Sequence, residues 1–375
     1  MLLSSQSKSR CLSEVGKMWS KSRSLLNMRA VDVSRKLSCG SGILLGSVLL
    51  VGNQDKEEKK WTVEYPTKVN KNDVALSRKI NSEMDKTNLG LRLYQYQTCP
   101  YCCKVRAFLD YYGFSYEVVE VPILITPCCE KPIFESSLII SALVTFLHRK
   151  NMTFPEAVEL YPKIVETDHT DIKVVGVNFP NKFVIYFDEK EATVPGKQPY
   201  KELHNIREER EWREWVDDYF IHLISPNVYR TFNESIETFR YFDRVGEWQR
   251  NFPAWERYLA IYVGATAMFQ ISKMLKKRHN IGDERAELRA AFEKFLEAKG
   301  PHRRFLGGDE PNLADLSLFG AINSFAGCSA FEEMRRETQI GTWYEDMQRA
   351  VDEHRGAALL RAKCNAIAAL EKKKE

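Results

Sequence analysis

The chain has 375 residues, 44% hydrophobic and 28% charged, with a formal net charge of +4 and nine cysteines. That length allows two domains with extensions, and the composition is sufficient for a sizeable core. So small a net charge gives no reason to expect a nucleic-acid partner, and the cysteine spacing is unlike a secreted disulfide framework. We therefore expect its thiols to be reduced, as in a cytosol-like compartment.

The first 60 residues differ from the rest in composition. Residues 1–36 hold eight Lys or Arg, two acidic residues and nine Ser, a pattern typical of organelle-targeting segments, including mitochondrial ones. Residues 37–54 carry no charge, but their apolar centre at 43–51 is short for a membrane span of about 20 residues. Residues 1–60 are therefore predicted to be a targeting segment or a single marginal anchor, with a disordered extension as the alternative. Residues 61–88 form a linker.

Residues 91–112 carry the main chemical motif. Residues 91–96 alternate as in a short strand, and 105, 108, 109 and 112 share one helix face. Between them lies Cys99-Pro-Tyr-Cys102, so Cys99 is expected at the N-terminus of a helix. Free amide groups and the positive end of the helix dipole favour an anion there, which predicts a depressed pKa for Cys99. Half of a zinc site, completed by Cys103, Cys128 and Cys129, is the alternative interpretation.

Two more segments complete the predicted thiol domain, residues 89–150. Residues 116–121 form a second strand, and residues 121–125 form a third that begins at Pro122. Glu135-Ser136-Ser137 precedes a helix at 138–147, and Ser136 is the expected cap. Amide groups free at that helix start can receive a carboxylate.

Residues 151–200 are expected to form a connector with a β-hairpin, pairing 173–178 with 182–187. Residues 201–372 are expected to be helical. One stripe comprises Trp212, Trp215, Val216, Tyr219 and Leu223. Further helices are predicted at 254–277, 283–298 and 345–371, with Trp255, Tyr258, Leu259 and Tyr262 among the apolar positions of the first. Asn312 and Asp315 form a capping box that supports folding.

YQYQTCPYCCKVRAFLDYYGFSYEVVEV, HLISPNVYRT, ISKMLKKRH and PNLADLSLFG resemble segments of the microsomal prostaglandin E synthase type 2 family, over most of residues 89–349. The resemblance implies a thioredoxin-like α/β domain of the glutaredoxin type, followed by an all-helical domain like that of glutathione transferases. One departure is clear: relatives carry a helix between the second strand and the Val-Pro strand, and this chain has none. Since a parallel crossover takes a dozen or more residues, the sheet is expected to be shortened or rebuilt.

The resemblance also implies a function. It is the isomerisation of prostaglandin H2, a lipid endoperoxide, to prostaglandin E2, with glutathione or another small thiol as cofactor and heme as an optional ligand. It further implies a homodimer, with peripheral or single-anchor attachment at the cytoplasmic side of the Golgi membrane. No metal ion is implied.

Residue roles follow from the same resemblance. The catalytic residues would be Cys99, Cys102 and Tyr96. Glutathione would be held by Tyr101, by Val121 and Pro122 with a cis bond, and by Glu135 and Ser136. The polar residues His222, Ser225 and Arg278 would link the helical domain to the cleft, and Met274 replaces an arginine of relatives.

Two other functions remain open. In a glutaredoxin-like thiol–disulfide oxidoreductase, Cys99 would be the nucleophile and Cys102 the resolving thiol. In a glutathione-transferase-like binding protein, the thiol site would be degenerate. Replacement of Cys102 separates the first two functions, because isomerisation should need only Cys99.

Overall fold

The computed structural model describes residues 78–119, 124–125, 133, 135–167, 174–187 and 199–372. The predictions for residues 1–77, for Val121 with its cis Pro122 and for Cys128 with Cys129 lie outside these ranges. No helix within the described ranges is both long and apolar enough to cross a membrane.

A four-stranded sheet forms the base of the thiol domain. Its strands are β1 (Arg78–Ile80), β2 (Leu91–Tyr94), β3 (Tyr116–Val119) and β4 (Leu124–Ile125), in the order β1-β3-β2-β4. Strand β2 runs parallel to β3 and antiparallel to β4, whereas β1 is antiparallel to β3. Leu91, Leu93 and Val118 are fully buried, as the alternating pattern predicted.

The missing helix does not displace the third strand. Only residues 120–123 separate β3 from β4, yet β4 pairs with β2 on the side opposite to β3. The expectation of a parallel crossover of a dozen or more residues was wrong, because β4 is antiparallel to β2 and that length requirement applies to parallel connections.

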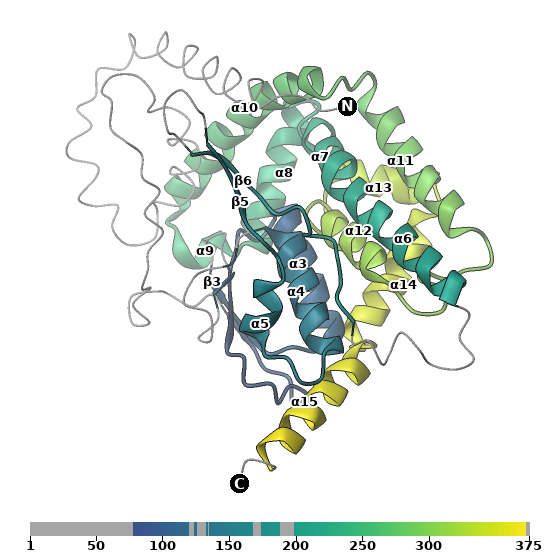
Figure 1. The fold of residues 1–375 in the computed structure, drawn as a ribbon. Helices are drawn as coiled ribbons and strands as arrows, with labels where there is room; N and C mark the ends of the chain where they lie inside the picture. The colour runs from purple at the N-terminus through teal and green to yellow at the C-terminus, as the bar shows by residue number, and fades with distance from the viewer. Residues whose placement is uncertain are drawn as a thin grey trace.

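Two long helices accompany the sheet. Helix α3 (Pro100–Tyr112) and helix α4 (Ser136–His148) pack together, and α5 (Phe154–Glu159) follows α4 (Figure 1). Phe108 and Leu109 of α3 are completely buried, which fits the predicted helix face. The fold class expected for residues 89–150 is confirmed.

The connector forms a different hairpin from the predicted one. Strand β5 (Ile164–Thr167) pairs antiparallel with β6 (Val174–Asn178), and residues 182–187 are turn and coil. The apolar composition of residues 182–187 predicted a strand. The segment needs no partner strand, because side chains hydrogen-bond to its backbone groups. Tyr161 donates its hydroxyl to Val184 O at 2.8 Å, and Tyr186 N donates to Thr145 Oγ1 at 3.1 Å.

Helices make up the rest of the described chain: α6 (Pro199–Trp215), the π-helix η2 (Val216–Phe220), α7 (Ile221–Val228), α8 (Phe232–Val245), α9 (Trp248–Asn251), α10 (Ala254–Arg278), α11 (Glu284–Lys299), α12 (Leu313–Asn323), α13 (Ser329–Glu337), α14 (Ile340–Asp352) and α15 (Ala357–Glu371). The all-helical second domain is confirmed. The single helix predicted at 345–371 is wrong, because turns at residues 353–356 separate α14 from α15.

One hydrophobic core runs through both domains. Helix α12 packs closely on α3, and a Cβ added at Gly320 would lie 2.4 Å from Lys104 Cα, so only glycine permits this approach. The predicted capping box is present, with Asn312 accepting from Ala314 N and Asp315 N. The buried Asp315 also accepts from Leu306 N at 2.9 Å and Trp343 Nε1 at 3.2 Å. The capping bonds fix the start of α12, and the close approach at Gly320 joins α12 to α3, the helix that Cys99 caps.

Candidate active site

Cys99 lies at the N-cap of α3, as predicted, with Pro100 in the first turn. The pKa of Cys99 is lowered to about 6. A hydrogen bond from the Cys102 thiol is the largest cause; it outweighs the opposing effect of burial, and backbone amides of Cys102 and Tyr101 add to it. The sequence predicted this direction from the helix terminus alone, but the neighbouring thiol contributes most.

The other two cysteines of the motif are poor nucleophiles. The hydrogen bond to Cys99 and burial raise the pKa of Cys102, and burial raises that of Cys103 to about 11. Cys103 points away from the cleft: Arg106 donates to its sulfur at 3.0 Å, and Gln97 O accepts from it at 3.4 Å. No cluster suited to a metal ion occurs within the described ranges.

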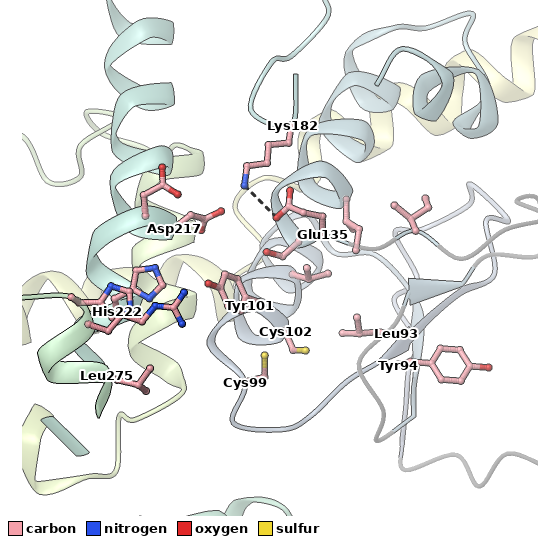
Figure 2. Close-up of a pocket in the computed structure, with 17 residues that line it drawn as sticks. Leu93, Tyr94, Cys99, Tyr101, Cys102, Glu135, Lys182, Asp217, His222 and Leu275 are labelled. Carbon is pink, nitrogen blue, oxygen red and sulfur yellow. Dashed lines mark ion pairs between the residues drawn. The ribbon is translucent and has the colours of Figure 1, made fainter. Parts of the chain in front are cut away.

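Cys99 opens into a cavity of about 710 Å³, which we call the polar lobe. Its polar lining comprises Glu135, Ser136, Lys182, Asp217 and Asp218 (Figure 2). Cys102 and Tyr101 also line it, so five of the eight predicted site residues (Cys99, Tyr101, Cys102, Glu135 and Ser136) meet here. Val121 and Pro122 lie outside the described residues.

The cap of α4 differs from the prediction. Glu135 and not Ser136 is the N-cap, and its carboxylate accepts from Ser137 N at 3.4 Å and Leu138 N at 3.2 Å. The longer glutamate reaches these amides because its backbone adopts a φ of 85°. Ser136 is freed from capping, and its hydroxyl is buried without a hydrogen-bond partner while lining the polar lobe. A buried unpaired hydroxyl at a helix start is suited to a ligand carboxylate.

Lys182 is a site residue that the sequence did not reveal. Its ammonium lies 3.9 Å from a Glu135 oxygen, across the mouth of the polar lobe (Figure 2). The backbone beside it is held in place, because Ser141 donates to Lys182 O at 2.6 Å and Arg213 to Phe183 O at 3.2 Å. Because residues 182–187 were predicted to be a strand, Lys182 was not expected to line a cavity. Its positive charge was the one sequence feature that suited an anionic ligand.

A second missed feature is the pair of carboxylates on η2. Asp217 is buried, pairs with the fully buried Lys104 of α3 and accepts from Ser137 Oγ at 2.5 Å. Asp218 is exposed and faces the polar lobe. This buried network fixes η2 against α3 and the start of α4, so it sets the width of the cleft.

The second cavity, about 330 Å³, is the apolar lobe. Its walls include Ile224, Val228 and Phe242, and Tyr96 lies edge-on to Phe242 with ring centroids 6.5 Å apart. The two lobes share Cys99, Tyr101, His222, Leu275 and His279. Both linings are largely apolar, but only the polar lobe is lined by Asp, Glu, Lys or Arg, so the reactive thiol sits where a chamber with charged side chains meets one without them. Ser225 belongs to the apolar lobe and Arg278 to the polar one.

The fold and site together define a glutaredoxin-type thiol domain joined to a helical domain, with a low-pKa cysteine at their junction. A glutaredoxin family model matches residues 91–123, the strand, motif and helix that position Cys99. Curated relatives extend the match: Prostaglandin E synthase 2 of Danio rerio is 38% identical over 83% of this chain and 82% of its own length. Prostaglandin E synthase 2 of Mus musculus is 41% identical over 71% of each chain. The chain belongs to the prostaglandin E synthase 2 family.

Proposed function

We propose that this protein isomerises prostaglandin H2 to prostaglandin E2 with the help of a thiol. The observation that carries the proposal is the position of Cys99 between the two lobes. An endoperoxide with long hydrocarbon chains fits the apolar lobe, and a polar thiol cofactor fits the polar one. The family relationship supports the type of reaction, and the position of Cys99 between the lobes supports it as the reacting thiol.

The chemistry balances without an outside oxidant. A thiolate, of Cys99 or of glutathione bound beside it, attacks the ring oxygen on the carbon that becomes the ketone. The S–O bond forms, the O–O bond breaks, and the second oxygen leaves as an alkoxide that takes up a proton. Loss of the hydrogen from that carbon then forms C=O, breaks the S–O bond and returns the thiolate. The Cys99 pKa of about 6 keeps its thiolate populated at neutral pH.

Glutathione is the proposed cofactor. Its γ-glutamyl carboxylate would meet the unpaired Ser136 hydroxyl at the start of α4, with Lys182 nearby, and its ammonium would meet Glu135. Tyr101 would shape the wall beside the tripeptide, and Tyr96 would hydrogen-bond to the reacting oxygen from the apolar side. Val121 and Pro122 are proposed to meet the glutathione backbone.

Heme is an optional ligand in this proposal. The apolar walls at Ile224, Val228 and Leu275 suit a porphyrin face. Glutathione bound beside Cys99 would supply a thiolate ligand to the heme iron, which would tune the electron density of the iron. Absorbance at the Soret band during titration with heme and glutathione tests this binding.

Disulfide exchange is a second candidate, because the Cys102 thiol donates directly to Cys99 as a resolving thiol would. Three proteins decide between the functions: wild type, Cys99→Ser and Cys102→Ser, each assayed for prostaglandin E2 by mass spectrometry and for reduction of a protein disulfide. Isomerisation that needs Cys99 but survives Cys102→Ser supports our proposal. Disulfide reduction that needs both thiols, without prostaglandin E2, supports the oxidoreductase. If the Cys99→Ser variant keeps both prostaglandin E2 formation and disulfide reduction, both candidate functions are contradicted.

We also propose a homodimer formed through the outer face of α10. Trp255, Tyr258 and Leu259 are 66%, 63% and 53% exposed, and Tyr262 and Val263 continue the same uncharged stripe. Arg257 is the basic residue within 254–263 and is paired with Asp243, so this described part of α10 offers no free basic charge of the kind that favours anionic lipid. A second copy can match the stripe with itself. Leu259→Glu should convert a dimer to a monomer in light scattering. A monomeric wild type contradicts the proposal, and so does vesicle binding by a protein without residues 1–60 that Leu259→Glu abolishes.

Attachment to a membrane is assigned to residues 1–60. It would direct the protein to the cytoplasmic side of the Golgi or to mitochondria, in line with the basic, Ser-rich composition of the segment.

A further inference from the structure

Two histidines stack on each other at the junction of the lobes. The rings of His222, on α7, and His279, directly after α10, have centroids 4.1 Å apart and are inclined by 15°. Both side chains are half-buried, and both line the polar and the apolar lobe. Figure 2 shows His222 across the cleft from Cys99, with Tyr101 between them. The sequence resemblance assigned His222 to structural support and gave His279 no role.

The surroundings keep both rings neutral. Burial is the main cause that lowers the pKa of each ring, and the Arg278 guanidinium adds to it. His222 further lowers the pKa of His279, whereas Asp218 and Asp217 on η2 oppose the effect at His222. From the α3 side, Cys99 and Tyr101 face the same space. A neutral imidazole near pH 7 can accept a proton.

The proposed reaction needs such an acceptor at this place. Formation of the ketone requires removal of a hydrogen from carbon, and when Cys99 is the nucleophile its thiolate is already committed to the S–O bond. Of the residues shared by both lobes, Leu275 has no basic atom, and burial raises the pKa of Tyr101 far above neutrality, so its phenol stays protonated. The carboxylates of Glu135, Asp217 and Asp218 line the polar lobe only. Within the described residues, the imidazoles are the remaining bases at the junction.

We propose that the His222–His279 pair is the general base of the isomerisation and takes the proton from the carbon that becomes the ketone. The inference rests on the proposed function. The base accepts the hydrogen as a proton, the C–H electrons form C=O, the S–O bond breaks, and the thiolate is regenerated. The proton then passes to solvent or to the alkoxide made in the first step. Because the rings lie so close, a proton on one disfavours a proton on the other, so the two titrate as a coupled pair of which one ring takes the proton.

The test compares wild type with His222→Asn, His279→Asn and the double variant, using substrate with and without deuterium at the carbon that becomes the ketone. The double variant should lose about 10²-fold or more in kcat, the usual contribution of a general base, with KM changed less than threefold. Its deuterium isotope effect on kcat should exceed that of wild type, because C–H cleavage becomes rate-limiting. Added imidazole should restore part of the rate. The isotope effect replaces a pH profile as the readout, since Cys99 titrates in the same range.

Controls separate this inference from the proposed function. His302→Asn changes an exposed histidine outside both lobes and should leave the kinetics at wild-type values. The rate of Cys99 alkylation should be unchanged in the double variant, which shows that the thiol site is folded. If that rate changes, the double variant with Gln at both positions is assayed instead. A wild type that makes no prostaglandin E2 would defeat the proposed function. A wild type that makes it, with a double variant of equal kcat and isotope effect, would overturn the general-base assignment alone.

Discussion

Replacement of Asp217 by Asn should destabilise the protein far more than a surface substitution. The Lys104 side chain is completely buried and pairs with Asp217, which is 5% exposed; Lys104 Nζ also donates to Ser137 Oγ at 3.2 Å. With Asn at 217, the ammonium remains in the core with only neutral acceptors, Ser137 Oγ and the new amide oxygen, and no negative charge. Removal of one partner from a buried ion pair costs about 3–5 kcal/mol, a large part of the roughly 5–15 kcal/mol that stabilises a domain.

Urea unfolding of Asp217→Asn and wild type measures this loss. The paired variant Lys104→Met with Asp217→Leu is the matched control, because replacing both charges with apolar groups of similar size is often neutral or stabilising by about 1–4 kcal/mol. If the single variant loses less than about 1 kcal/mol, Lys104 has water or another partner, and the network does not hold η2 against α3. Equal losses in the single and paired variants would show that packing, not charge, is what matters.

The same pair predicts a direction for acid sensitivity. Burial alone would raise the pKa of Asp217, but the Lys104 charge and hydrogen bonds from Lys104 and Ser137 together lower it. A carboxyl whose folded pKa is depressed contributes stability above its unfolded pKa of about 3.9 and loses it as the pH falls through the folded value. The stability difference between wild type and the paired variant should therefore be constant from pH 5 upward and change only in more acidic solution.

Three further predictions follow from the structure. Cys99 alkylation should have a midpoint near pH 6 that survives Cys102→Ser, which keeps a donor, and rises with Cys102→Ala; identical midpoints in both variants would contradict the dominant role of the Cys102 thiol. Deletion of residues 1–55 should remove membrane association and leave Cys99 reactivity unchanged, since it removes the uncharged run at 37–54; a truncated protein that still sediments with membranes would place the anchor elsewhere. Asp315→Ala should cost at least about 3 kcal/mol in urea unfolding, because Leu306 N and other buried donors lose their acceptor at about 1–3 kcal/mol each; Glu310→Ala, at an exposed position nearby, is the matched control and should cost little.

Sequence rules that act within one helical turn predicted two features correctly: Cys99 at a helix start, and the capping box of α12. Cys99 was placed at a helix start because proline and an apolar periodicity follow it, and both effects act within one turn. The Asn312–Asp315 box was recognised for the same reason. Such short-range rules could not predict that Lys182 lines the cavity. Its backbone is held by hydrogen bonds from Ser141 and Arg213, which are distant in sequence.

Competing local rules explain the errors. Serine is the usual cap, so Ser136 was preferred, but Glu135 reaches the free amides through an uncommon positive φ. The run at 182–187 has the composition of a strand, yet Tyr161 and Thr145 satisfy its backbone groups without a partner strand. At the start of α4 a glutamate took the place of the expected serine cap, and at 182–187 side chains took the place of a partner strand.

The π-helix η2 explains why the carboxylates of the polar lobe were missed. A regular helix predicts that Trp215, Tyr219 and Leu223 share one buried stripe, but Tyr219 is 40% exposed and Phe220 is completely buried in its place. Leu223 is buried as the stripe predicts, so the departure is confined to η2, whose turn is of the wider i→i+5 type. Within η2, Asp217 is buried against Lys104, while Asp218 lines the cleft. A break in helical periodicity next to two acidic residues is therefore the signal that could have located this wall of the site.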